Sequence, residues 1–524
     1  MRRHLWILTT LITLATGAEA NAASPDTVFT DYVRAIFAED WPVAESFWLP
    51  DEVAHAKRLG VEFTGVPLKV DCSSPLIEHR WALRDKTIQM SIADSTINDT
   101  LIAKTVTIRA GAESVALSHK YLLVATPEGG WRITSPIYHI TRSWPEINTL
   151  HVRVRCPADS LINQFALDAL NGLIDSLGTI FHFRPEHWIK LNKQKIDYYL
   201  ADRETIRALT GYDAHGMTHL PLDAVVTSHL PHEHEIVHAL LNYRLAPLPL
   251  YTLPALQEGI AVSYGGRWGK TPSVVMHLGA FVIQSELMTV DDILTHQGFN
   301  SDASDLSYAL GGLLTRCLIE SIGFPKFSVL YRRLSGPQQY IRSLSDHAIR
   351  KAIEESTLQP WAMLVPSCIE REVAIFSHRG IDPCPSIPKE NEVWRNPLPR
   401  NGNEFVITED SKYYYFEARG ERAGSTVGFF LNDPKRFNEP AYRSRLYSEQ
   451  FPKQRYDGQM VGIVFDSLEA GVYDYRTDML LAKFASGFSQ GESIWDAEHR
   501  VVRFRVDKNI MPIDLKSGNL RMIW

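Results

Sequence analysis

The sequence has no apolar run of membrane-spanning length, few cysteines and no excess of basic charge. Its 524 residues include 54 lysines and arginines against 61 acidic residues, which gives a net charge of −7, and no basic cluster is long enough to form a patch. Nucleic-acid binding depends on such positive patches, so we exclude it as the function. The apolar run from Leu5 to Leu14 is shorter than the roughly 18 to 20 residues of a spanning helix, so no stable membrane anchor is expected.

The small number of cysteines limits the role of disulfides. There are five, so at least one must be free. Cys317 lies among leucines on a helical pattern, which indicates a small buried hydrophobe. We expect Cys368 to pair with Cys384, because Pro383 and Pro385 fit a stapled loop, although spacing alone leaves the connectivity open.

The N-terminus has the features of an export signal. Arg2 and Arg3 precede the apolar run, and alanines at small-residue spacing follow it up to Ala22. This order is typical of a signal peptide, and the short run disfavours the alternative of a membrane anchor. We therefore expect residues 1–22 to be removed and the mature protein to be periplasmic or secreted.

The composition, 45% hydrophobic and 22% charged, predicts that most of the chain folds, and the length predicts three domains. In the first, residues 24–142, a short helix precedes alternating apolar runs, a Gly-Gly turn and Trp131-Arg132-Ile133. This layout resembles the cone-shaped α+β domains of the ketosteroid-isomerase-like superfamily. In an accessory position the resemblance implies a scaffold or binding module.

The second predicted domain, residues 148–375, begins with a strand at Leu150 to Val154 and a helix from about Ser160. Further strands are expected near residues 188–200 and 222–227 before helical patterns dominate, an order typical of α+β proteins. Beyond it we predict a proline-rich linker and then an all-β sandwich, from the spacing of five strand-like runs. These two regions are residues 376–402 and 403–524.

One stretch of the second domain contains the pattern HExxH in a single frame, His234 to His238, because the residue four after His232 is an isoleucine. On a helix both imidazoles share a face, where they can meet one metal ion at Zn–N distances of about 2.0 to 2.1 Å. Glu235 is offset around the helix and can serve as the general base for a zinc-bound water. The alternative, ordinary surface histidines, is disfavoured by the helical context.

A third ligand lies twenty residues beyond His238. Glu258 stands near the start of a second predicted helix, after Pro254 and before Gly259. A catalytic zinc takes three protein ligands and keeps one open position, whereas a structural zinc takes four and favours cysteine. A lone glutamate here would be a solvated helix residue, but together with His234 and His238 it completes a candidate His₂Glu site.

Three matches carry a resemblance to a known family: residues 234–238, residues 258–261 (Glu-Gly-Ile-Ala) and residues 308–311 (Tyr-Ala-Leu-Gly). On them the second domain resembles the gluzincin zinc metallopeptidases, enzymes with HExxH plus a glutamate, and particularly the peptidase MA-like proteins. The resemblance implies that Tyr308 stabilises the oxyanion of the scissile carbonyl; a tyrosine that only packs at a helix start is the alternative. It also implies that residues 216–227 include an edge strand for an extended substrate.

Two departures from the gluzincin pattern stand out. The GxMEN motif of the aminopeptidase branch is absent, so nothing marks recognition of a free substrate N-terminus. The acidic residue that often follows the glutamate ligand by four positions, where it orients a zinc histidine, is replaced by Val262. Ser263 and Tyr264 are the nearby candidates for that role. Four other histidines near the motif (215, 219, 229 and 232) have spacings that fit no common metal site.

The fold class predicted from these observations is multidomain α+β, with a gluzincin-type core between a cone-like domain and an all-β domain. The predicted function is an exported zinc metallohydrolase, a peptidase acting on peptides or proteins, with Glu235 and Tyr308 as catalytic residues. The flanking domains are candidates for contact with a cell-envelope polymer or a protein partner. The alternative is an inactive binding or scaffold protein that keeps a gluzincin body, an interpretation favoured by Val262.

Overall fold

The structure is a computed structural model with mixed α and β content and several sheets. The predicted signal peptide lies outside the residues that it describes. The described residues are 24–109, 117–157, 164–267, 271–284, 286–301, 304–377, 380–388, 391–396, 402–425, 427–432, 460–474, 487–511, 515 and 519–523.

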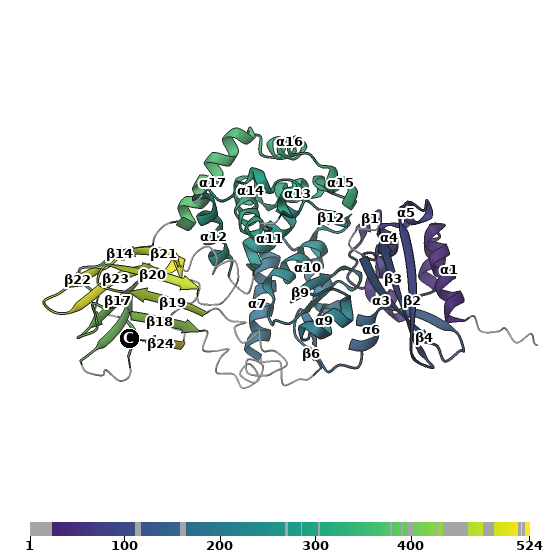
Figure 1. Cartoon of the computed structure of the whole chain (residues 1–524), viewed down its shortest axis with the longest axis horizontal. Helices are drawn as coiled ribbons and strands as arrows, with labels where there is room; N and C mark the ends of the chain where they lie inside the picture. The colour runs from purple at the N-terminus through teal and green to yellow at the C-terminus, as the bar shows by residue number, and fades with distance from the viewer. Residues whose placement is uncertain are drawn as a thin grey trace, which may run out of the picture. The chain divides into compact units, whose positions relative to one another are not determined.

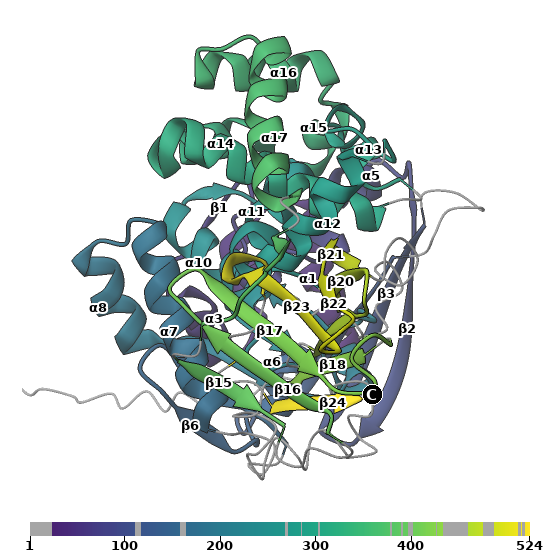
Figure 2. The ribbon, with the colours of Figure 1, turned by 90° about the vertical axis from the view of Figure 1, so that its left-hand side faces the viewer.

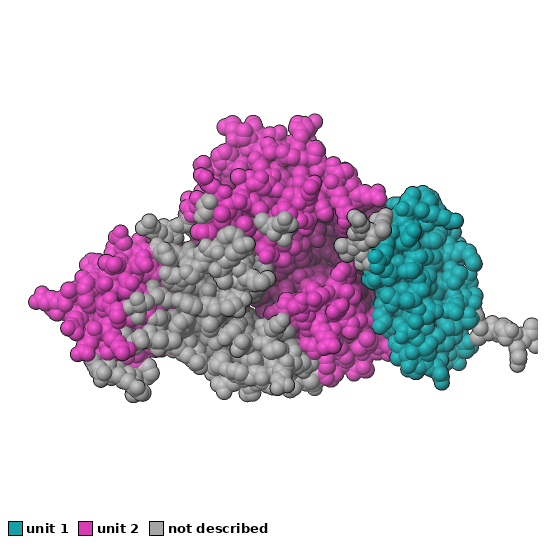
Figure 3. Space-filling model, viewed as in Figure 1, with its two compact units in different colours: residues 1–49, 79–135 teal, residues 50–78, 136–524 magenta. Residues whose placement is uncertain are grey.

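The chain divides into two compact units, which are coloured separately in Figure 3. Unit 1 comprises Met1–Leu49 and His79–Ser135, and unit 2 comprises Pro50–Glu78 and Pro136–Trp524. The sequence-based division placed residues 50–78 in the N-terminal domain, whereas the structure assigns them to the unit that carries the HExxH motif.

Unit 1 contains an N-terminal helix, two short helices, α2 (Trp41–Ser46) and α5 (Arg80–Arg84), and an antiparallel sheet. Helix α1 (Pro25–Phe37) begins at Ser24, whose hydroxyl accepts from the amide of Thr27. The sheet has the order β2-β3-β4-β5, and its strands are β2 (Gln89–Asn98), β3 (Leu101–Arg109), β4 (Leu117–Ala125) and β5 (Trp131–Thr134). The helix and the sheet share an aromatic core, in which the rings of Tyr32 and Tyr121 meet edge to face with centroids 6.0 Å apart.

Unit 2 is built around a five-stranded sheet of order β6-β7-β8-β10-β9. Its inner strands are parallel and β9 is an antiparallel edge strand. The sequence predicted strand structure from residue 188, but Pro185 begins a helix there, as its fixed φ allows at a first helical position. The strands and this helix are β6 (Glu146–Asn148), β7 (Val152–Arg155), β8 (Ile196–Leu200), β9 (Gly216–His219), β10 (Ala224–Thr227) and α8 (Pro185–Gln194).

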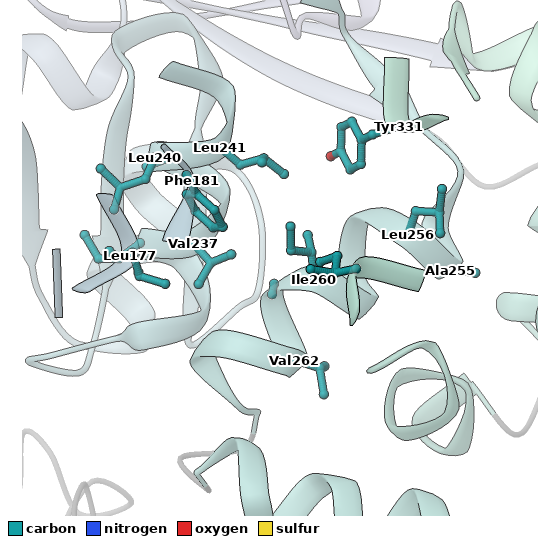
Figure 4. Close-up of a cluster of buried hydrophobic side chains, with 14 of the residues drawn as sticks. Leu177, Phe181, Val237, Leu240, Leu241, Ala255, Leu256, Ile260, Val262 and Tyr331 are labelled. Carbon is teal, nitrogen blue, oxygen red and sulfur yellow. The ribbon is translucent and has the colours of Figure 1, made fainter. Parts of the chain in front are cut away.

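Helices and two small two-stranded sheets form the rest of this part of unit 2, and one continuous hydrophobic core joins the helices to the five-stranded sheet. Helix α11 lies between α10 and α14 in both Figure 1 and Figure 2. Figure 4 shows part of this core, including Val237 of α10 and Ile260 of α11. The helices of this part include α7 (Gln164–Ile180), α10 (Glu233–Leu245), α11 (Pro254–Gly265), α12 (Pro272–Gln284), α14 (Ser304–Arg333), α16 (Asp346–Thr357) and α17 (Trp361–Ser377).

The C-terminal part of unit 2 consists of two antiparallel sheets around a shared core. Phe405 from one sheet stacks on Phe465 from the other, with ring centroids 5.5 Å apart. The first sheet contains β14 (Ile381–Pro383), β15 (Glu392–Arg395), β16 (Glu404–Glu409), β17 (Tyr413–Arg419), β22 (Ile494–Asp496) and β23 (Val501–Asp507). The second contains β18 (Val427–Asn432), β19 (Met460–Phe465), β20 (Glu469–Asp474), β21 (Gly487–Glu492) and β24 (Asn519–Ile523).

The prediction of a linker at residues 376–402 is wrong in two places. Strands β14 and β15 lie within it, at the two ends of the first sheet's order β14-β23-β17-β16-β15. An edge strand tolerates proline because one row of its amides needs no partner. Pro383, which pairs opposite Phe504, therefore marks an edge strand and not a linker.

The predicted disulfide between Cys368 and Cys384 is also wrong. Cys384 is a buried free thiol whose sulfur donates to the carbonyl of Ser386. Cys317 is buried, as predicted, but it is disulfide-bonded. Helical periodicity indicates that a cysteine faces the core and cannot indicate which other cysteine faces it there.

No helix in the described part of the chain is long and apolar enough to cross a membrane.

A buried carboxylate ties residues 50–78 to the central sheet. Asp197 of β8 is fully buried, accepts a hydrogen bond from Arg153 at 2.6 Å, and lies 2.9 Å from Arg58. The ring of His55 contacts the same carboxylate. Burial alone would raise the pKa of Asp197, but the opposing effects of Arg58, His55 and Arg153 lower it far below its usual range.

We expect Asp197→Asn to lower the free energy of unfolding by about 3 to 5 kcal/mol, because it leaves Arg58 and Arg153 without their buried counter-charge. Urea denaturation at pH 7 measures this loss. Because the pKa of Asp197 is lower in the folded state, its carboxylate stabilises the fold at pH values above its unfolded-state pKa of about 4. The difference in unfolding free energy between wild type and variant should therefore shrink as the pH falls below about 4. Asp496→Asn, at the surface pair with His499, is the control and should change stability by less than about 0.5 kcal/mol. Equal effects of the two substitutions would contradict this account.

Candidate metal centre

Helix α10 presents both motif histidines on one face. His232 precedes the helix and caps it, because its ring nitrogen accepts from the amide of Glu235 at 3.4 Å. His234 and His238 follow one turn apart, with ring centroids separated by 4.9 Å and planes at 78°. Their Nε2 atoms lie 3.3 Å from each other, so both point to one place.

Helix α11 brings Glu258 to the same place. Its Oε2 lies 3.1 Å from Nε2 of His234 and 3.5 Å from Nε2 of His238. In a tetrahedral zinc site with ligand distances of about 2.0 to 2.1 Å, neighbouring ligand atoms are separated by about 3.3 Å. The three atoms therefore have the spacing of a His₂Glu zinc site. Among the described residues, these three form the one group of its kind.

His234 is buried, His238 and Glu258 are half-buried, and the three groups are electrostatically coupled. Burial would raise the pKa of Glu258, but the nearby imidazoles, led by His238, hold it well below its ordinary value. Burial would likewise lower the pKa of His238, and the carboxylates of Glu258 and Glu235 reverse that effect. Since Glu258 stays ionised, it can contribute the negative charge that a cation requires.

A backbone carbonyl orients the first histidine. Nδ1 of His234 donates to the carbonyl oxygen of Gly266 at 2.8 Å, which leaves the lone pair of Nε2 directed at the site. From the sequence, Ser263 and Tyr264 were the candidates for orienting a histidine of the site. Instead, the hydroxyl of Ser263 donates to backbone carbonyls, including that of Gly312 at 2.9 Å, and Tyr264 packs edge-on against Phe181.

Glu235 lies beside the three candidate ligands. The hydroxyl of Thr218, in the edge strand β9, donates to Oε2 of Glu235 at 2.9 Å, which holds the carboxylate in place. Burial would raise the pKa of Glu235, but the surrounding histidines, led by His238, lower it. Glu235 is therefore ionised and positioned to accept a proton.

Tyr308 lies in the first turns of α14, within electrostatic reach of the site. Burial and, after it, the charge of Glu258 raise the pKa of Tyr308 to about 12. The strongest opposing influence is Arg267, whose guanidinium carbon lies 3.2 Å from the centre of the Tyr308 ring. The hydroxyl therefore stays protonated at neutral pH and can donate a hydrogen bond.

Close packing of α11 against α14 positions Glu258 relative to Tyr308. Val262 of α11 is fully buried and labelled in Figure 4, and a Cβ atom added to Gly312 of α14 would lie 2.7 Å from Cγ1 of Val262. The valine in the expected acidic position is thus a packing residue. A carboxylate there would be buried against a helix with no partner for its charge.

The remaining histidines near the motif do not form a second cluster of ligand atoms. The rings of His215 and His229 are 6.0 Å apart, and those of His229 and His232 are 5.4 Å apart, both edge to face. Within the described residues no group other than the His₂Glu set brings three ligand atoms within 4.8 Å.

Three contributors to the site were not anticipated from the sequence. They are the hydroxyl of Thr218, the carbonyl of Gly266 and the guanidinium of Arg267. A carbonyl has no side-chain signature, although the Gly265-Gly266 pair marks a helix end, where carbonyls are free to accept. Thr218 and Arg267 are ordinary polar residues until the fold brings them to the motif.

Comparison with models of known protein families gives no match to this chain. A search of curated proteins gives no match either. The chemistry of the site therefore rests on its own geometry.

We expect Gly312→Ala to lower the free energy of unfolding by about 1 to 3 kcal/mol, because the new methyl group would overlap Val262 and Met276. Thermal or urea unfolding measures this change. Gly172→Ala is the matched control, since Gly172 is exposed in α7 with no atom within 4 Å of an added Cβ. It should raise stability by up to about 1 kcal/mol. A stabilising effect at both positions would show that α11 and α14 do not pack this closely.

Proposed function

We propose that the protein is an exported zinc-dependent peptidase with a gluzincin-type core. The observation that carries the proposal is the spacing of three ligand atoms, with Nε2 of His234, Nε2 of His238 and Oε2 of Glu258 separated by 3.1 to 3.5 Å. Among the residues that the structure describes, three protein ligands converge and no fourth joins them, which is typical of catalytic sites because an open position remains for water or substrate.

Zinc suits this donor set, because two imidazoles and one carboxylate are its common catalytic ligands. A zinc ion bound there would act as a Lewis acid on a scissile carbonyl and bring the pKa of a coordinated water to about 7. Gly266 sets the tautomer of His234 that such binding requires.

Glu235 is the general base of the proposed reaction. As an ionised carboxylate held by Thr218, it takes a proton from the attacking water and delivers it to the leaving amine. Tyr308, protonated at neutral pH, donates a hydrogen bond to the oxygen on which negative charge develops. Both roles require side chains that are already in position before the substrate binds, which the packing of α10, α11 and α14 supplies.

The edge strand β9 is the proposed binding site for the substrate backbone. It is the last strand in the sheet order, and its Thr218 contacts Glu235, so the strand runs beside the general base. Backbone pairing to an edge strand tolerates many sequences, which suits peptide or protein substrates. Figure 3 shows unit 2 hollowed between its upper and lower parts on the face seen there.

The alternative function, an inactive scaffold, was favoured by the missing acidic residue at Val262 and by the two large flanking domains. The carbonyl of Gly266 supplies the hydrogen bond that such a residue would make to a histidine. This hydrogen bond supports the peptidase over the scaffold.

We expect the protein to bind one equivalent of zinc and to gain thermal stability from it, since zinc binds the folded site. His238→Ala should lower zinc affinity by more than the roughly 10- to 100-fold lost with an outer-shell partner. Metal analysis after dialysis measures the stoichiometry. His232→Asn keeps a capping acceptor for α10 and should still bind zinc. Loss of zinc in both variants, or in neither, would contradict the ligand assignment.

Glu235→Gln should lower kcat for peptide hydrolysis by about 10² to 10⁴, because the amide cannot accept the proton of water. The measurement uses a quenched fluorescent peptide library with the zinc-loaded protein. Zinc content should stay at the wild-type value, because Glu235 is not a ligand in this assignment. If wild type shows no turnover on any member of the library while binding zinc, the peptidase proposal is wrong.

A further inference from the structure

Strand β9 directs the backbone groups of two residues away from its neighbour β10. The amide of Ser228 donates to the carbonyl of His215 at 2.8 Å, which continues the antiparallel register of these strands as a hydrogen-bonded pair. Such pairs alternate with pairs whose N–H and C=O groups point away from the partner strand. In this register Gly216 and Thr218 belong to the second kind. Their N–H and C=O groups therefore face the open edge of the sheet.

The same two residues face the start of helix α10. Side chains two positions apart along a strand lie on one face of the sheet, and the hydroxyl of Thr218 contacts Glu235 on that face. Gly216 meets His232 there, since a Cβ atom added to the glycine would lie 2.7 Å from Nε2 of the imidazole. The ring of His232 thus occupies the space that a side chain at position 216 would fill.

The imidazole of His232 has one nitrogen in use and one available. Its Nδ1 accepts the amide hydrogen of Glu235 at 3.4 Å, and a ring that accepts at Nδ1 carries its proton on Nε2. Within the described part of the chain Nε2 makes no hydrogen bond, and it is not one of the buried side-chain atoms that lack a partner. His232 is half-buried. Its Nε2 is therefore a hydrogen-bond donor that reaches the surface.

An extended peptide paired with the open edge of β9 would bring one side chain to this donor. Residues directly opposite each other in neighbouring strands place their side chains on the same face, with Cβ atoms about 4.5 to 5.5 Å apart. A substrate residue opposite Gly216 would therefore direct its side chain to the face on which Nε2 of His232 lies. At that separation the donor matches an acceptor oxygen bonded to Cβ or to the next atom, as in serine, threonine and asparagine.

The register also fixes where this side chain would lie relative to the general base. A substrate residue opposite Thr218 would lie beside Glu235, because Thr218 contacts that carboxylate. The residue opposite Gly216 would be two positions away, about 7 Å along the strand. Since the His232 ring is neutral and Glu235 is ionised, the position favours an uncharged acceptor over an aspartate.

We propose that Gly216 and His232 form a side-chain subsite that selects substrates with a short uncharged acceptor, namely serine, threonine or asparagine. The selected residue is two positions from the one beside Glu235. Gly216 has no side chain, which lets the imidazole reach the strand, and His232 supplies the donor. The inference rests on the proposed peptidase function and specifies its substrate class.

Matched peptides test the subsite with the full-length zinc-loaded protein. Acetylated and amidated peptides carry threonine in place of valine, or asparagine in place of leucine, at each position in turn. Each pair differs in polarity more than in size. We expect a kcat/KM preference for the polar peptide at one position only, of roughly 2- to 10-fold, the range for one neutral hydrogen bond. Equal rates within the pairs at every position would overturn the proposal.

Two substitutions test the two nitrogens of His232 separately. In His232→Asn the amide oxygen keeps an acceptor near the position of Nδ1, so α10 stays capped, but no donor extends to the position of Nε2. The preference should disappear. In His232→Gln the amide nitrogen lies near the position of Nε2, so part of the preference should remain while the unfolding temperature falls with the lost cap. A preference that persists in His232→Asn would overturn the proposal.

Gly216→Ala tests the other half of the subsite. Its methyl group would displace the imidazole, so this variant should also lose the preference. Gly172→Ala is the matched control, since a Cβ atom added there meets no atom within 4 Å, and it should keep the wild-type preference. Loss of the preference in both variants, or in neither, would contradict the role of Gly216.

A binding measurement separates this inference from the proposed function. Calorimetry on the Glu235→Gln protein gives the Kd of both peptides of a pair with no need for turnover. A preference for the polar peptide that is lost on adding His232→Asn supports the subsite even if wild type hydrolyses nothing, in which case only the peptidase assignment fails. Equal affinities within every pair would overturn the subsite even if hydrolysis is observed.

Discussion

The close approach of α11 to the two helices beside it is the constraint on which the candidate metal centre depends. A Cβ added to Gly265 at the end of α11 would lie 2.6 Å from the amide nitrogen of His234, and one added to Gly312 of α14 would overlap Val262. Only short contacts of this kind bring Glu258 within 3.5 Å of two histidines on another helix. Because the interior is closely packed, small displacements would separate the three ligand atoms.

The same packing brings charged groups together where water cannot screen them. Two glutamates and two histidines share a buried site, and an isolated buried charge is costly unless it is paired. A divalent cation between them would satisfy this requirement. A cation bound at the candidate metal centre would therefore balance the charges of the glutamates. Asp197 shows the other solution in the same unit, since arginines of the chain itself balance its charge.

Local sequence patterns predicted the positions of helices and strands better than they predicted which elements and residues contact one another. The HExxH helix, the helix carrying Glu258 and the strands beyond residue 403 follow from periodicity of 3.6 or 2 and from prolines at helix starts. The errors share one physical cause. Pro383 lies in a strand because that strand is an edge, Cys384 is a free thiol while Cys317 is disulfide-bonded, and residues 50–78 join unit 2 through Asp197. Each outcome depends on a neighbour that is remote in the sequence.

The sequence by itself determined that His234 and His238 share one face of a helix with Glu235 beside them, because the pitch of an α-helix requires it. It also singled out Glu258 by its spacing. Only the tertiary structure decided that the three ligand atoms converge, that a backbone carbonyl orients His234, and that Arg267 lies over Tyr308. Those contacts join α10, α11 and α14, and their distances come from packing between helices, which no local periodicity encodes.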